Sequence, residues 1–136
     1  MEESQAVREA WLGFCEGISR GEVERFDDIV SDRAHLIIGT APGEMVTERE
    51  RMRFGFETEG VTLESRSAQA YAEGTLGWAV DEPRFGFPDG SGFDCRVTAI
   101  LRNEDDTWKI VHAHFSVGVP DEEVADLQKK WAQSTE

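Results

Sequence analysis

The sequence is poor in cysteine and has no long apolar run. Two of its 136 residues are cysteines, Cys15 and Cys95, and no motif pairs them. We therefore expect two buried thiols in a reducing cytoplasm, and neither a disulfide nor a metal site. No apolar run approaches the roughly 20 residues of a transmembrane helix. Residues 1–5 lack the basic and apolar segments of a signal peptide. These absences predict a cytoplasmic protein without a membrane anchor.

Positive charge is also scarce. The 14 lysines and arginines stand against 28 aspartates and glutamates, which gives a net charge of −14 at pH 7. This charge repels the phosphates of nucleic acids and of anionic membrane surfaces, so we expect neither as a partner. A hydrophobic content of 39% is typical of a globular protein. The length predicts a single domain, 1–136, with a core at about 4–119 and a C-terminal helix at about 120–133.

Hydrophobic periodicity predicts helices in the first part of the chain and strands in the second. Ser4 is a candidate N-cap, and apolar residues then recur at helical spacing up to Gly21. Thr47 and Glu50 have the spacing of a capping box. This order of elements predicts an α+β fold, in which helices cover one face of a curved antiparallel sheet. The expected helices are at about 5–20, 23–30, 48–57 and 120–133, and the expected strands are at about 35–38, 61–71, 76–87, 93–102 and 108–117.

The most informative segment is 108–117, where residue types alternate with period two, as in a strand. Both sets of alternate positions are rich in apolar residues, so we expect both faces of this strand to be covered. The polar end of the first set should face a pocket. A β-bulge in the strand would reverse this assignment. The first set is Trp108, Ile110, His112, His114 and Ser116, and the second is Lys109, Val111, Ala113, Phe115 and Val117.

Four motifs follow one another along the chain: Gly39-Thr40-Ala41-Pro42-Gly43-Glu44, Gly77-Trp78, Arg96-x-Thr98 and the strand 108–116. Their order and spacing resemble those of SnoaL-like domains. The last strand is also similar to one in the association domain of calcium/calmodulin-dependent kinase II, a relative in the nuclear transport factor 2-like superfamily. The resemblance covers about residues 4–119. It implies a cone, in which a strongly bent antiparallel sheet wraps around a long first helix and a pocket opens at one end.

The resemblance also implies a partner, because members of the superfamily usually associate through the outer face of the sheet. On the alternation described above, this face would carry Val111, Ala113, Phe115 and Val117. The chain's own helices cannot cover this apolar set if they already cover the other face. We therefore expect a homodimer.

The histidine pair is the centre of the expected site. His112 and His114 would lie about 7 Å apart on one face of the strand. His114 is the candidate general base, because histidine titrates near neutral pH; both histidines could instead be hydrogen-bonded core residues. Arg96 could bind an anion in the pocket, or face outward to a surface acid. The candidate ligand-binding residues are His112, Ser116, Arg96, Trp78 and Tyr71.

Three functions remain open at this point. The first is a small-molecule-binding domain whose ligand, apolar or anionic, lies inside the cone. The second is an isomerase, cyclase or hydrolase with His114 as general base, although Tyr71, Asp81 and Asp94 do not align into the constellation of a ketosteroid isomerase. The third is a non-catalytic oligomerisation module. The sequence has no nucleotide-binding loop and no nucleophile elbow, so we expect no cofactor.

Overall fold

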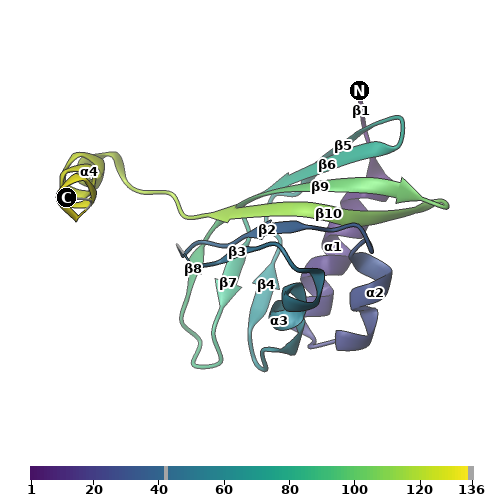
Figure 1. Ribbon diagram of the computed structural model, residues 1–136, viewed down its shortest axis with the longest axis horizontal. Helices are drawn as coiled ribbons and strands as arrows, with labels where there is room; N and C mark the ends of the chain where they lie inside the picture. The colour runs from purple at the N-terminus through teal and green to yellow at the C-terminus, as the bar shows by residue number, and fades with distance from the viewer. Residues whose placement is uncertain (42, 135–136) are drawn as a thin grey trace.

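The computed structural model describes residues 1–41 and 43–134 of the chain. They form an α+β fold in which a long, bent sheet covers helices on one side (Figure 1). The long sheet has the strand order β1-β5-β6-β9-β10-β2-β3, and a second sheet has the order β4-β7-β8. Neighbouring strands are antiparallel except for β10 and β2, which are parallel. The predicted α+β class and the cone are therefore confirmed.

The strands of the long sheet are β1 (Glu2–Glu3), β5 (Gln69–Glu73), β6 (Leu76–Asp81), β9 (Arg96–Glu104), β10 (Thr107–Ser116), β2 (Leu36–Ile38) and β3 (Met45–Val46). Those of the second sheet are β4 (Thr62–Glu64), β7 (Arg84–Gly86) and β8 (Gly92–Asp94). The helices are α1 (Gln5–Ser19), η1 (Val23–Arg25), α2 (Phe26–Ile29), η2 (Arg49–Arg53), α3 (Phe54–Glu57) and α4 (Asp121–Ser134), where η marks a 3₁₀ helix.

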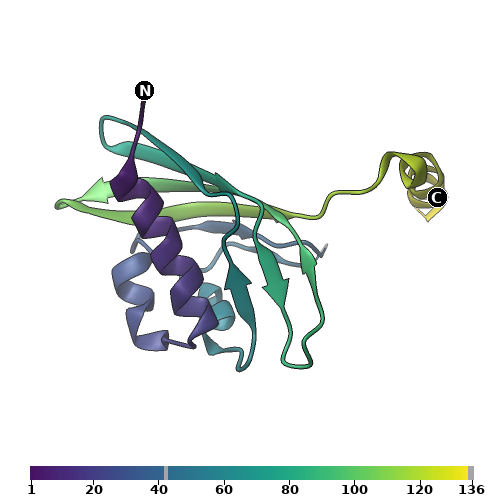
Figure 2. The ribbon, with the colours of Figure 1, turned by 180° about the vertical axis from the view of Figure 1, so that it is seen from behind.

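Helix α1 begins where the sequence predicts it. The Ser4 hydroxyl caps the helix by accepting a hydrogen bond of 3.2 Å from the backbone N–H of Val7. One face of the helix is buried, including Trp11, Phe14 and Ile18. This apolar stripe crosses the concave side of the long sheet and also contacts β4 in the second sheet (Figure 2). Helix α1 therefore fills the middle of the cone.

A row of four alanines lets the helix approach the long sheet closely. Ala70, Ala79, Ala99 and Ala113 pair in register across β5, β6, β9 and β10, and all four are buried. Gly77 continues this small-residue surface, because a Cβ atom there would lie 2.7 Å from Cγ2 of Val7 on α1. Side chains at paired positions share one face of a sheet, so this row marks the inner face of the cone.

The cone closes because two stretches of extended chain, β6–β7 and β8–β9, bend at neighbouring positions. Pro83 separates β6 from β7, and Cys95 separates β8 from β9. The backbone N–H of Cys95 donates a hydrogen bond of 2.9 Å to the Pro83 carbonyl, which joins the two bends. Below them, β7 and β8 leave the long sheet and run beside α1 with β4 (Figure 2). The continuous strand predicted at 93–102 is therefore split between two sheets.

Two other predicted elements also differ in detail. The helix expected at 48–57 is a 3₁₀ turn, η2, followed by the single turn α3. Its N-cap residue is Glu48, which makes no side-chain capping bond, so the capping box of Thr47 and Glu50 does not form. The strand expected at 61–71 divides into β4 and β5. Between them the backbone N–H groups of Arg66 and Ser67 bond to the carboxylate of Asp81 instead of to a neighbouring strand.

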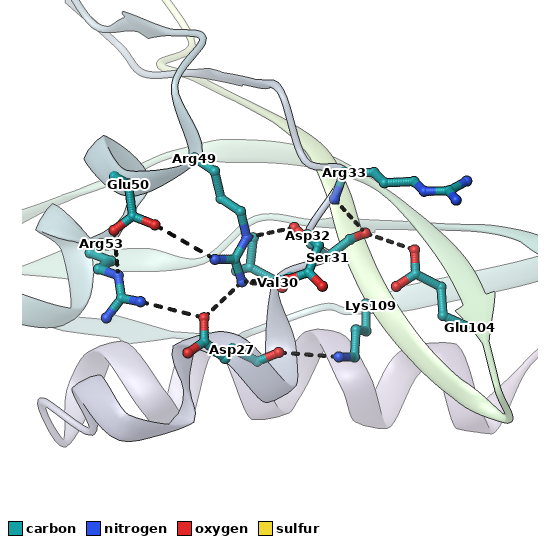
Figure 3. A network of polar contacts seen from close by, with 10 residues as sticks. All are labelled: Asp27, Val30, Ser31, Asp32, Arg33, Arg49, Glu50, Arg53, Glu104 and Lys109. Atoms are coloured by element: carbon teal, nitrogen blue, oxygen red, sulfur yellow. Dashed lines mark hydrogen bonds and ion pairs between the residues drawn. The ribbon is translucent and has the colours of Figure 1, made fainter.

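A polar network fastens the short helices to the end of the long sheet (Figure 3). Arg49 donates to the carbonyls of Val30 and Ser31 at 2.9 and 2.8 Å and to the Asp27 carboxylate at 2.9 Å. The buried Ser31 hydroxyl donates to Glu104 of β9 at 2.7 Å. These hydrogen bonds join α2, η2 and β9, so we regard the network as structural.

The last helix, α4, stands apart from the rest of the domain at the end of an extended segment (Figure 1). Val124 and Leu127 are only half-buried, and Trp131 is 54% exposed. Among the described residues, no helix is both long and apolar enough to cross a membrane.

Candidate ligand-binding site

A β-bulge in β10 decides which side chains reach the inside of the cone. Ile110 pairs with Leu101 of β9, and His112 pairs with the next residue, Ile100, so Val111 is the extra residue. Ile110 is fully buried before the bulge, and Ala113 is fully buried after it. The alternation of the strand therefore changes by one residue at Val111.

The bulge reverses the predicted orientation of the polar residues. His112, His114 and Ser116 lie on the outer face of the long sheet, and Ala113 and Phe115 lie on the inner face. The prediction that the histidine pair faces the cone is wrong for this physical reason. The same shift removes Ala113 and Phe115 from the expected dimer face, while Val117, beyond the end of β10, is 45% exposed.

The other predicted site residues lie on the outer face as well. Tyr71, Trp78, Ile100 and His112 form one row across four strands, and Arg96 pairs with Ser116 at the end of β10. The rings of Tyr71 and Trp78 stack with centroids 5.9 Å apart. Arg96, His112, His114 and Ser116 line an open groove of about 500 Å³. The structure brings the predicted residues together on one surface, but Trp78 and Tyr71 do not form a wall of the cone. That these residues bind a ligand stays a prediction, and the place where they could bind it is the outer groove.

The inside of the cone holds a separate cavity of about 320 Å³. Its wall is almost entirely apolar and includes six of the eight phenylalanines of the chain. The wall comes from α1, η2, α3, both sheets and the β2–β3 loop, and its lining residues include Ile18, Met52 and Leu63. The lining phenylalanines are Phe14, Phe54, Phe85, Phe87, Phe93 and Phe115.

Aromatic contacts shape one side of this cavity. Phe85 of β7 stacks on Phe93 of β8 with centroids 5.5 Å apart, and Phe87 packs edge-on against Phe85 at 5.3 Å. Phe87 is 43% exposed and Phe54 is 49% exposed, so both present apolar surface to solvent as well as to the cavity. Sequence reasoning missed this cluster. The available signal was the group of phenylalanines on either side of the turn at 87–92, in strands that the alternation had already predicted.

Few groups in the cavity wall can take part in proton transfer. Burial raises the pKa of the Cys95 thiol to about 11, with smaller contributions from the negative charges of Asp81 and Asp94. This thiol therefore stays protonated and is a poor nucleophile near neutral pH. Glu44, in the loop between β2 and β3, is the charged residue of the lining set. Among the described residues, no cluster of histidine, cysteine, aspartate or glutamate could hold a metal ion.

Asp81 is a buried carboxylate with a structural role. One oxygen accepts a hydrogen bond of 2.8 Å from Nε1 of Trp11, and the other accepts from the backbone N–H groups of Ser67 and Glu82. Burial acts to raise the pKa of Asp81. Hydrogen bonds from Ser65, Trp11 and the backbone outweigh burial and hold the pKa below its usual value. Asp81 therefore anchors α1 to the corner of the cone, and its donors occupy the lone pairs that a general base would use.

The family is identified by a model of the SnoaL-like domain, which matches residues 7–120. The chain belongs to the SnoaL-like domain family. The matched region contains the cavity and every strand of both sheets except β1, whereas α4 lies beyond it. No curated protein matches the chain significantly.

Solved structures share the fold at low sequence identity. An uncharacterised protein with a cystatin-like fold from Caulobacter vibrioides is 17% identical, with a TM-score of 0.70, over 92% of this chain and 96% of that one. A candidate dehydratase of the nuclear transport factor 2-like family from Streptomyces avermitilis is 18% identical, with a TM-score of 0.68, over 85% and 96%. A candidate ketosteroid isomerase from Shewanella frigidimarina is 15% identical, with a TM-score of 0.67, over 83% and 96%. At these identities the likeness establishes the cone fold alone.

Proposed function

We propose that this domain binds a compact, apolar small molecule inside the cone. The observation that supports the proposal is the cavity of about 320 Å³ with its phenylalanine-rich wall. Pockets for small molecules commonly measure roughly 300–1,000 Å³ and are lined by apolar and aromatic groups with a few polar ones. Burial of apolar ligand surface against such a wall supplies affinity at about 25 cal/mol per Å².

Binding explains the site better than catalysis does. An isomerase of the ketosteroid type needs a carboxylate base and an oxyanion hole beside the substrate. In this chain, Tyr71 and His114 lie on the outer face of the sheet, and the Asp81 carboxylate is occupied by N–H donors. His114 is therefore on the wrong side of the sheet to act as general base on a ligand in the cone. The dehydratase and isomerase named above share the fold, and their chemistry is not carried over.

A matched pair of substitutions tests where an apolar ligand binds. Phe87→Asp places a carboxylate in the cavity wall, and Val80→Asp places one in the outer groove; both residues are partly exposed, at 43% and 36%. We expect Phe87→Asp to weaken binding of the neutral probe naphthylmethanol at least tenfold in isothermal titration calorimetry, because a charge in an apolar pocket is costly to desolvate. Val80→Asp should change the dissociation constant less than twofold.

The proposal would be contradicted if the probe did not bind to the unsubstituted protein. It would also be contradicted if Val80→Asp, and not Phe87→Asp, removed binding. Circular dichroism of both variants checks that the fold is retained.

A further inference from the structure

The loop between β2 and β3 places the carboxylate of Glu44 at the cone cavity. This loop is the Gly39–Glu44 motif of the sequence. The backbone N–H of Gly39 donates to the Glu44 carbonyl at 2.7 Å, and the backbone N–H of Glu44 donates to the Ala41 carbonyl at 3.0 Å. These bonds close the loop at the rim of the cavity, which Gly39, Thr40 and Glu44 all line.

The Glu44 side chain is folded back and held in place. Its Oε1 atom accepts a hydrogen bond of 2.8 Å from the backbone N–H of Ala41. The side chain also lies against Gly39, where an added Cβ atom would be 2.7 Å from Cβ of Glu44 and 3.1 Å from its Cδ. Any side chain larger than hydrogen at position 39 would therefore displace Glu44. A glycine at this position lets the carboxylate keep one place in the cavity wall.

The described lining of the cavity gives this carboxylate no positively charged neighbour. Among the lining residues of the described chain there is no lysine, arginine or histidine. Within the same described part, no cation forms an ion pair with Glu44. Arg96, the residue expected to bind an anion, lies in the groove on the other face of the sheet. An anionic ligand in the cone would thus meet one carboxylate, no cation, and the field of a chain with net charge −14.

We propose that Glu44 makes the cone selective for apolar ligands that carry a protonated amine, and against those that carry a carboxylate. The apolar body of the ligand would lie among the phenylalanines, and its ammonium group would donate to the Glu44 carboxylate at the rim. Charge-assisted hydrogen bonds of this kind are stronger than neutral ones, and phenylalanine faces also attract cations. This inference rests on the proposed function, because it assumes that ligands enter the cone.

The test compares three probes that share one apolar body: naphthylmethylamine, naphthylmethanol and naphthoate. Each is titrated by calorimetry into the unsubstituted protein, into Glu44→Gln, and into the control Glu48→Gln. The control makes the same change of net charge at an exposed residue outside the cavity wall. We expect the unsubstituted protein and the control to bind the amine at least tenfold more tightly than the carboxylate. In Glu44→Gln this ratio should fall to threefold or less, while affinity for the alcohol changes less than twofold.

A second variant tests the positioning of the carboxylate without removing it. Gly39→Ala should lower the amine-to-carboxylate ratio toward that of Glu44→Gln, because the added methyl group displaces the Glu44 side chain. Added salt should also lower the ratio, since it screens the charge at the rim.

The outcomes separate this inference from the function on which it rests. Alcohol binding with an unchanged amine-to-carboxylate ratio in Glu44→Gln would overturn the role of Glu44 and leave the apolar site intact. Tighter binding of the carboxylate than of the amine would overturn it as well. Failure of all three probes to bind would overturn the proposed function and the inference together.

Discussion

At the scale of single residues, Asp81 shows how one polar group can hold a corner of the fold. Its carboxylate joins Trp11 of α1 to the backbone between β4 and β5, so three parts of the chain meet at one side chain. A buried acceptor is costly unless it is fully hydrogen-bonded, and here it is. The sequence indicated only an acid within the strand expected at 76–87, because its donors Trp11, Arg66 and Ser67 come from residues far away in the chain.

Replacement of this carboxylate should destabilise the protein. Asp81→Asn puts an NH₂ group where one carboxylate oxygen now accepts, so an N–H donor of Trp11 or of the backbone loses its partner. We expect the free energy of unfolding at pH 7 to fall by roughly 2–4 kcal/mol. The control Asp94→Asn removes a solvent-exposed ion pair with Arg66 and should cost less than about 1 kcal/mol. Urea denaturation followed by circular dichroism measures both.

The same carboxylate predicts a pH dependence. Because the native pKa of Asp81 is lowered from 3.8, the native state binds this proton more weakly than the unfolded chain does. The contribution of the Asp81 carboxylate to the free energy of unfolding is therefore complete above its pKa in the unfolded chain. It is lost as the pH falls through its pKa in the native state. The stability difference between the unsubstituted protein and Asp81→Asn should be constant from pH 5 to 7 and should shrink below about pH 4. A difference that grew on acidification would contradict this assignment.

At the scale of elements, one bulged residue accounts for the main error of the sequence interpretation. The pattern from Trp108 to Ser116 correctly predicts a strand, and the capped apolar stripe correctly predicts α1. Periodicity cannot reveal that Val111 is an extra residue, because bulges depend on the partner strand β9. Every side chain of β10 after Val111 therefore lies on the opposite face of the sheet from the one predicted. The sequence indicated only one of the two bends. Proline at position 83 indicated the first, whereas no residue type around Cys95 indicated the second.

The alanine row offers a direct test of which face is inside. Ala99→Leu places a large side chain on the inner face of β9, where Ala99 is fully buried. Overpacking of this kind should lower the free energy of unfolding by roughly 1–3 kcal/mol. Thr98→Leu introduces the same side chain at the preceding residue, which is exposed on the outer face, and should change stability by about 0.5 kcal/mol or less. Equal effects of the two substitutions would contradict the inner and outer faces described above.

At the scale of the whole molecule, the outer face of the long sheet and α4 are the exposed parts that a partner could cover. The face exposes Leu76, Val80 and part of Trp78. It also carries Arg96 in a chain that is otherwise strongly acidic. The first turn of α4 is acidic (Asp121, Glu122, Glu123), so its charge complements that of Arg96. We therefore still expect a homodimer through the outer face, but with different contact residues from those first predicted.

A substitution in the middle of this face tests the expected dimer. Trp78→Glu places a charge among the apolar residues and should convert a dimer to a monomer in size-exclusion chromatography with light scattering. Met45→Glu is the control, because Met45 is 61% exposed on β3, at the edge of the long sheet. It should leave the mass of a dimer unchanged. An unsubstituted protein that remained monomeric at high concentration would contradict the prediction.

The central claim is that the cone, and not the outer groove, is the ligand site. Methyl NMR spectra recorded during titration with naphthylmethanol test it most directly, because both surfaces carry methyl groups. If the claim is correct, the shifts will concentrate on Ile18, Met52 and Leu63 in the cavity wall, and Val80 and Thr98 in the groove will stay unchanged. Shifts confined to Val80 and Thr98, or no shifts at saturating probe, would contradict it.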